Sequence, residues 1–119
     1  LSQHSKVEKV IYAGLDVDEA GKRASKYLKG GFGALCGFEL KGGKSSGQKF
    51  IDNLNMFYHV ANIGDARSLA IHPATTTHSQ LSDDDMLATG VSPSYVRLSI
   101  GIEHIDDIIS DLSNALDNA

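Results

Sequence analysis

The sequence is poor in cysteine, in clustered basic residues and in long apolar runs, and each scarcity excludes a class of protein. The single cysteine, Cys36, excludes an intramolecular disulfide framework and fits a reducing compartment, where a free cysteine is usually a small buried residue. The net charge is −4 and no basic run could follow a phosphate backbone, so we expect no nucleic-acid partner. No apolar run approaches the roughly 18 residues of a membrane span and no signal peptide is evident, so we expect a cytoplasmic protein without a membrane partner.

The length and composition are those of one ordinary globular domain. The chain has 119 residues, of which 41% are hydrophobic and 22% charged. A domain of this size can bury roughly two-thirds of the surface of its unfolded chain, so we expect residues 1–119 to form a single domain with a real core. Because the chain begins at Leu1 rather than Met, we expect it to be a fragment or a processed chain.

Hydrophobic periodicity divides the chain into alternating strand-like and helical segments. The predicted strands alternate apolar and polar residues and cover residues 7–15, 34–40, 67–73 and 95–100. The predicted helices have apolar residues three and four apart and cover residues 20–28, 50–61, a short stretch after Ser82, and 105–116. Asp16 or Asp18 is the expected N-cap of the first helix, and "KGGKSSGQ" (41–48) is a predicted turn.

The patterns favour an α+β fold with a mostly antiparallel sheet. Each helix carries one apolar stripe, and the strands alternate rather than run continuously apolar, as strands buried on both faces tend to do. We therefore expect the helices to pack on one face of the sheet and to leave the other face for a partner. In the last strand Val96 and Leu98 point to the apolar side, so Arg97 points to the open face. The residues alone leave Arg97 equally compatible with a ligand site and with a surface or interdomain salt bridge.

Two apparent site motifs fail on inspection. "GFELKGGKS" (37–45) resembles a phosphate loop, but Phe38 stands where that loop needs its first glycine. His72 and His78, with the acidic run 83–85, have a spacing that crosses a proline and a threonine-rich loop rather than one helix face. We expect these histidines to be solvated loop residues, and we expect no metal site.

Four segments together resemble the C-terminal domain of the Cys/Met-metabolism family of pyridoxal-phosphate enzymes. They are "VIYAGL", "GGFGALCGFELKGG", "FIDNLNMFYHVANIGDARSLAIHPATTTHSQL" and "GVSPSYVRLSIGIEHIDDIISDLSNAL". The combination of "HPATTTH" with "RLSIGIE" is very specific to that family. The resemblance implies the small C-terminal domain of a fold-type I enzyme, within a longer chain whose cofactor-binding large domain is absent from these 119 residues.

The resemblance also implies a set of substrate-binding residues. In this family the arginine of the "RLS-G-E" strand binds the substrate α-carboxylate, which corresponds to Arg97. Asn62 stands where many members have a serine that helps to hold the catalytic lysine and the substrate. Thr77 matches a position near the cofactor and substrate, although a loop-capping hydroxyl explains it equally well.

Within the family, "AN-GDA" around Asn62 is similar to the O-acetylhomoserine sulfhydrylases. Ala61 is small where cystathionine lyases often have glutamate, which argues for a substrate without a distal amino acid. The implied reaction joins O-acetylhomoserine with sulfide to give homocysteine and acetate, in a homotetramer. A methionine γ-lyase or a cystathionine γ-synthase is the alternative within the family, and an independent α+β ligand-binding or regulatory module is the alternative outside it.

The family's Schiff-base lysine lies upstream of the region that this chain resembles. So do the phosphate-binding glycines, the stacking tyrosine and the aspartate that faces the pyridine nitrogen. None of the eight lysines here lies in the family's Ser/Thr-rich "TK" setting. We therefore expect pyridoxal phosphate to be bound by the absent large domain, with no catalytic or cofactor-binding residue in this chain and no activity from it alone.

Overall fold

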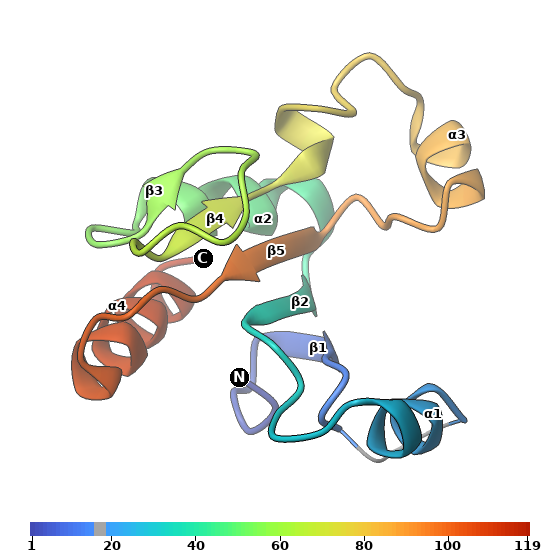
Figure 1. The fold of residues 1–119 in the computed structure, drawn as a ribbon. Coiled ribbons are helices and arrows are strands. Elements are labelled where there is room, and N and C mark those ends of the chain that lie inside the picture. Colours follow the sequence, from blue (N-terminus) through green and yellow to red (C-terminus); the bar gives the residue numbers. More distant parts are fainter. Residues whose placement is uncertain (16–18) are drawn as a thin grey trace.

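A computed structural model describes residues 1–15 and 19–119 (Figure 1). Asp16 and Asp18, the expected caps of the first helix, lie outside the described residues. The strands are β1 (Val7–Ile11), β2 (Leu35–Leu40), β3 (Tyr58–His59), β4 (Leu69–Ile71) and β5 (Tyr95–Ser99). The helices are α1 (Glu19–Tyr27), α2 (Gly43–Asp52), a short 3₁₀ turn η1 (Pro73–Thr75), α3 (Asp83–Ala88) and α4 (Ile105–Asp117).

The described strands form one five-stranded sheet in the order β1-β2-β5-β4-β3. Among the described residues every pair of neighbouring strands is antiparallel except β3 with β4, so the predicted α+β fold with a mostly antiparallel sheet is confirmed. β5 is the central strand, and Arg97 pairs with Gly37 on β2 and with Ile71 on β4. A side chain on β5 is thus held by strands on both sides.

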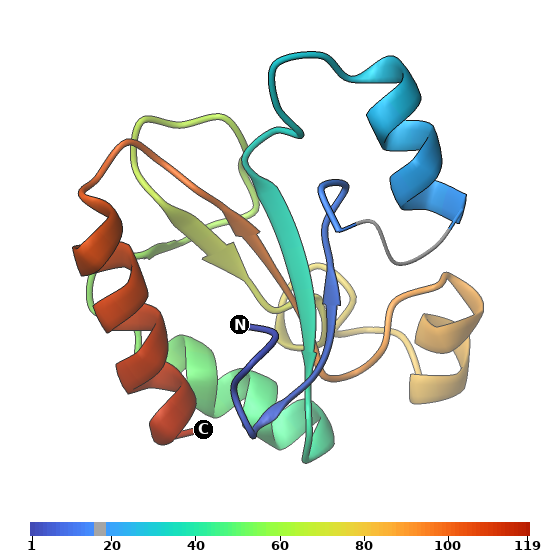
Figure 2. The same cartoon turned by 90° about the horizontal axis from the view of Figure 1, so that it is seen from below.

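The core lies between the sheet and two helices, α2 and α4. Phe38 on β2 meets Phe50 of α2 edge to face, with ring centroids 5.1 Å apart. The view along the strands shows α4 on one side of the sheet and α1 and α3 on the other, and the second view agrees (Figures 1 and 2). Buried residues that complete the core include Leu40, Ala70, Val96, Leu98, Ile108, Leu112 and Leu116.

Three of the sequence predictions are wrong in their boundaries. The helix predicted over 50–61 ends at Asp52, and the predicted turn 41–48 contains the first turns of that helix, α2. Phe50 and Phe57 have the spacing of a helix and both enter the same core, but Phe57 lies beyond the end of α2. The chain after Phe57 forms the edge strand β3 instead of a helix. The first strand is also shorter than predicted, ending at Ile11 rather than Gly14.

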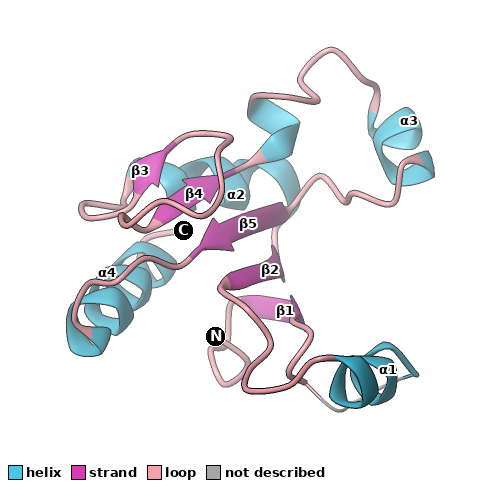
Figure 3. Cartoon of the chain, viewed as in Figure 1, coloured by secondary structure: helices cyan, strands magenta, loops and turns pink. Residues whose placement is uncertain are grey.

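The other helices begin where the sequence predicts. Ser82 caps α3, because its Oγ accepts a hydrogen bond from the Asp85 backbone N–H at 3.2 Å. α3 is a short helix between two extended loops (Figure 3). Helix α4 starts at Ile105 as predicted. In the part of the chain that the structure describes, no helix has the length and apolar character to cross a bilayer.

Candidate functional site

Arg97 lies in the middle of the open sheet face and is half-buried. Its Nη2 donates hydrogen bonds to the backbone carbonyls of Ala61 and Asn62, both at 3.2 Å. No described carboxylate forms an ion pair with the guanidinium. The positive charge is therefore fixed in position by neutral backbone groups, without an anionic partner in the described chain.

Two hollows flank Arg97 on this face. The first, of about 440 Å³, is lined by Ala61, Thr77, His78, Tyr95 and Arg97 together with Ile71, Pro73 and Val91, and we call it the Thr77 hollow. The second, of about 250 Å³, is lined by Cys36, Gly37, Tyr95 and Arg97 together with Ile11, Tyr12, Ala13 and Leu35, and we call it the Cys36 hollow. A small anionic ligand in either hollow would meet the Arg97 side chain.

The structure brings the three predicted substrate-binding residues close together but by different means. Thr77 lines the Thr77 hollow with Arg97, and its hydroxyl shares a hydrogen bond of 2.8 Å with His78 Nδ1. Asn62 contacts Arg97 through its backbone carbonyl, which accepts the hydrogen bond from Nη2, and Asn62 is an exposed residue. The contact of Asn62 with Arg97 is therefore made by its backbone, and the expected role of its side chain toward the catalytic lysine and the substrate stays a prediction.

Tyr95 belongs to this site although the sequence analysis gave it no role. It is two residues before Arg97 on β5, so the two side chains lie on the same face, and they are the two residues that line both hollows. Burial raises the pKa of the Tyr95 phenol, opposed by the positive charge of Arg97. The alternation of the strand was the available signal, because it puts Tyr95 on the face of Arg97.

Cys36 lies on β2 as predicted, but it is half-buried rather than buried. Burial raises the pKa of its thiol. A protonated thiol is a weak nucleophile, so Cys36 contributes surface to its hollow and no evident chemistry.

His72 is a fully buried residue, which corrects the expectation of a solvated loop histidine. Its Nε2 lies 2.8 Å from the Pro93 carbonyl, which can only accept, so Nε2 carries the proton and Nδ1 is left to face the Thr75 hydroxyl at 3.0 Å. Burial lowers the pKa of His72. The ring also lies directly against Gly47 of α2, where no side chain would fit. His72 therefore joins η1, α2 and the loop before β5, and its neutral form is the stable one.

Part of the "RLSIGIE" motif has a structural role beside Arg97. The Glu103 carboxylate accepts hydrogen bonds from the Ser68 backbone N–H at 2.7 Å and from the Ser68 hydroxyl at 2.8 Å. The Ser68 hydroxyl accepts in turn from the Gly101 backbone N–H at 2.9 Å. The hydrogen bond from the Ser68 N–H is the largest of the effects that lower the pKa of Glu103. These bonds fix the segment after β5 to the start of β4, and so help to set the position of Arg97.

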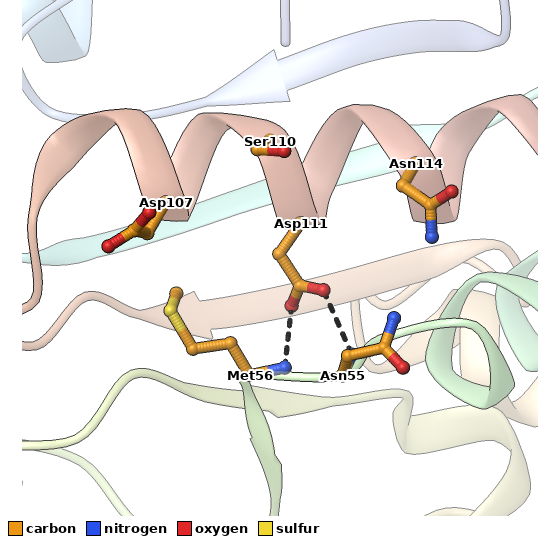
Figure 4. Close-up of a pocket in the computed structure, with 6 residues that line it drawn as sticks. All are labelled: Asn55, Met56, Asp107, Ser110, Asp111 and Asn114. Atoms are coloured by element: carbon orange, nitrogen blue, oxygen red, sulfur yellow. Dashed lines mark hydrogen bonds between the residues drawn. The ribbon is translucent and has the colours of Figure 1, made fainter.

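A further hollow of about 360 Å³ lies between α4 and the segment of Asn55 and Met56, and two acidic residues, Asp107 and Asp111, line it (Figure 4). The Asp111 carboxylate points at the 55–57 loop and accepts from the backbone N–H groups of Asn55 at 2.9 Å and Met56 at 3.0 Å. The N–H of Phe57 lies 3.4 Å from the same carboxylate. Asp111 therefore anchors the loop that leads into β3, and its carboxylate is not available to a ligand in this hollow. Across residues 1–15 and 19–119, no group of three or more His, Cys, Asp or Glu gathers as metal ligands do.

Comparison with known proteins defines the class. Residues 1–117 match the model of the family described as Cys/Met metabolism PLP-dependent enzymes, and the chain therefore belongs to that family. It is 54% identical over 119 residues to the O-acetyl-L-homoserine sulfhydrylase of Leptospira meyeri, covering 99% of this chain and 27% of that protein. It is 39% identical to an L-methionine gamma-lyase of Fusobacterium nucleatum subsp. polymorphum, covering 98% of this chain and 29% of that protein.

The fold is similar to that of a solved Campylobacter jejuni chain described as an O-acetylhomoserine (thiol)-lyase, which contains a pyridoxyl-lysine phosphate. The TM-score is 0.87 at 37% identity, and the match covers 98% of this chain and 28% of the other. The chain thus spans about a quarter of the length of the proteins it matches. The family resemblance inferred from the sequence, with its dependence on pyridoxal phosphate, is confirmed.

The lysines of the described chain lie outside the two hollows beside Arg97. All eight lysines lie in the described part, and seven of them are exposed. The eighth, Lys6, donates to the backbone carbonyls of Asp117 and Ala119, both at 2.8 Å. No lysine lines either hollow beside Arg97. What this chain offers on its open face is a cation for a carboxylate.

Proposed function

We propose that this chain is the substrate-carboxylate-binding domain of an O-acetylhomoserine sulfhydrylase. The complete enzyme would convert O-acetyl-L-homoserine and sulfide to homocysteine and acetate. In this proposal pyridoxal phosphate, which withdraws electrons from the substrate in such reactions, is held by the large domain outside these 119 residues. The 54% identity to a sulfhydrylase, against 39% to a methionine gamma-lyase, supports this branch of the family.

The observation that carries the proposal is the position of Arg97. A guanidinium carries several N–H donors in one plane, and a central strand holds that plane with little freedom to move. Its charge has no anionic partner in the described chain and adjoins two small hollows. An α-carboxylate of a small amino acid supplies the missing charge. Holding it there would orient the rest of the substrate toward the cofactor.

Thr77 and Asn62 complete the proposed substrate site. Thr77 adds a hydroxyl on the wall of the Thr77 hollow, and Asn62 fixes one end of the arginine. Ala61 lines the same hollow and adds no carboxylate there that could bind the amino group of a second amino acid. This favours a short substrate over cystathionine. We further propose that the complete enzyme is a homotetramer and is located in the cytoplasm. A free cysteine such as Cys36 is compatible with that reducing compartment.

The test is a comparison of substrates on the complete enzyme that contains this chain. We expect homocysteine from O-acetyl-L-homoserine with sulfide, at a kcat/KM well above that for release of a keto acid from methionine. Formation of cystathionine with cysteine as the sulfur donor is measured in parallel. Preference for methionine cleavage would reassign the protein to the lyases, and preference for cysteine to the cystathionine synthases. Absence of all three activities would contradict the proposal.

A further inference from the structure

The phenol of Tyr95 is the second polar group on the ridge that separates the two hollows. Tyr95 and Arg97 line both the Thr77 hollow and the Cys36 hollow. Because they are two residues apart on one strand, their side chains leave the sheet on the same face about 7 Å apart at the backbone. A ligand that touches Arg97 from either hollow is therefore within reach of Tyr95.

The Tyr95 hydroxyl forms no hydrogen bond with the residues that the structure describes, and it is accessible from the hollows, since no buried side-chain polar atom among these residues lacks a partner. Burial raises the pKa of the phenol, so the hydroxyl keeps its proton at neutral pH and can act as a donor. A half-buried tyrosine usually finds a partner for this hydroxyl. A ligand acceptor at this place would satisfy it.

Gly37 makes the room that this tyrosine needs. An added side chain at Gly37 would overlap the Tyr95 hydroxyl and ring, with the Tyr95 Cζ only 2.7 Å from the new Cβ. Gly37 pairs directly with Arg97 across the strands, so the ring lies over the backbone next to the arginine. The glycine thus lets the phenol lie against the sheet beside the guanidinium.

Arg97 on its own presents an incomplete set of donors. A guanidinium binds a carboxylate in parallel either through Nε and Nη2 or through Nη1 and Nη2, and Nη2 belongs to both pairs. Here Nη2 already donates to the Ala61 and Asn62 carbonyls. A carboxylate that meets Arg97 in this conformation therefore gains the donors of one nitrogen and leaves its second oxygen in need of another donor.

We propose that Tyr95 is a specificity-determining residue whose hydroxyl donates a hydrogen bond to the carboxylate that Arg97 holds. The inference rests on the proposed function, since it takes the ligand to be a small α-amino acid. Arg97 supplies the charge and Tyr95 supplies the second donor. The pair then distinguishes a carboxylate from an uncharged group of the same size.

The test is a pair of probes that differ only by the carboxylate, measured on the complete enzyme with its cofactor. The probes are L-norvaline and n-butylamine, and the measurement is the dissociation constant of each by calorimetry. Tyr95→Phe keeps the ring over Gly37 and removes the donor. We expect this variant to raise the dissociation constant of L-norvaline by roughly tenfold to a hundredfold, as loss of a hydrogen bond to a charged oxygen does. The dissociation constant of n-butylamine should not change.

The controls separate this inference from the proposed function. Tyr27→Phe removes a hydroxyl from an exposed tyrosine on α1 that lines neither hollow, and should change neither constant. If Tyr95→Phe binds L-norvaline normally while Arg97→Ala does not, Tyr95 has no such role and the proposed function stands. Equal weakening of both probes by Tyr95→Phe would make it a packing residue and overturn the inference. Normal binding of L-norvaline by Arg97→Ala would overturn the proposed function, and the inference with it.

Discussion

Arg97 combines a fixed position with an unpaired charge, and removing it should remove substrate recognition. In the complete enzyme we expect Arg97→Ala to lower kcat/KM for O-acetyl-L-homoserine by roughly 30- to 1000-fold, since losing one member of a desolvated charge pair costs about 2–4 kcal/mol. The absorbance spectrum of the cofactor should not change, because in the proposed enzyme the large domain binds the cofactor. Steady-state kinetics with spectra recorded alongside are the measurement.

Two further variants control for charge and for folding. Arg97→Lys keeps the charge but not the planar donors, so it should recover only part of the loss. Arg67→Ala removes an arginine that lies over the ring of Tyr58, 5.4 Å from its centroid, and that lines neither hollow. It should stay near wild type. Near wild-type kcat/KM for Arg97→Ala would make Arg97 a structural arginine and refute the carboxylate assignment.

For a single residue of a strand, the sequence predicts the face of the sheet on which the side chain lies but not the residues that it contacts. The alternation of β5 places Arg97 on the open face without any structure. The same alternation applies to Tyr95, yet its proximity to Gly37 depends on the register between β2 and β5, which a single sequence does not contain. The burial of His72 was missed for the same reason, because Pro93 and Gly47 come from distant segments.

Among the elements, α2 shows why a helical stripe can mislead. Its apolar residues Phe50 and Ile51 are few, and its first half reads as a glycine- and serine-rich turn. Packing of Gly47 against His72 and of Phe50 against Phe38 favours a helix there all the same. The apolar residues beyond Asp52 that reach the core, Leu54, Met56 and Phe57, lie in the loop before β3. Tertiary contacts thus outweighed local propensity, whereas α4, with a full apolar stripe, was predicted correctly.

The link between α4 and the loop before β3 depends on one carboxylate. Asp111→Ala would leave the buried N–H groups of the 55–57 loop without their acceptor (Figure 4). We expect a loss of about 2–4 kcal/mol in the free energy of unfolding, measured by urea denaturation of the 119-residue chain. The amide of Met56 should also exchange faster with solvent. Ser110→Ala, at the residue that precedes Asp111 in α4 and lines the same hollow, is the control and should cost less than about 0.5 kcal/mol.

The whole molecule should lose stability in acid, in two steps. The pKa of His72 is lowered by burial from an ordinary 6.5, so below that pH the unfolded chain takes up a proton that the folded chain resists. The pKa of Glu103 is lowered by its bonds to Ser68 from an ordinary 4.5, so its contribution is present above that pH and is lost as the pH falls further. Lys44 and His59 add to the effect on His72 by charge repulsion.

Urea midpoints between pH 7.5 and 3.5 test this dependence. We expect the midpoint to fall between pH 6.5 and 5, and again below pH 4.5. Glu103→Gln should flatten the second step and leave the first in place, because the two residues belong to separate hydrogen-bond groups. A midpoint that stays constant from pH 7.5 to 5 would contradict the assignment to His72.

The architecture of the chain was predictable because apolar and polar residues alternate along its strands and each helix has one apolar stripe. Both patterns can be recognised in the sequence of this chain alone. The location of the cofactor site outside these 119 residues stays a prediction, which rests on the family resemblance and on the absence of lysines from the hollows beside Arg97. The last prediction follows from that distribution of lysines. The 119-residue chain, incubated with stoichiometric pyridoxal phosphate and reduced with borohydride, should show no lysine labelled in preference to the others by peptide mass spectrometry. Seven of the lysines are exposed and Lys6 is tied to the C-terminal carbonyls, so none is enclosed by groups that would make one amine react in preference to the others. Stoichiometric labelling of one lysine would show that this domain forms a cofactor site by itself, and would refute the assignment of that site to the large domain.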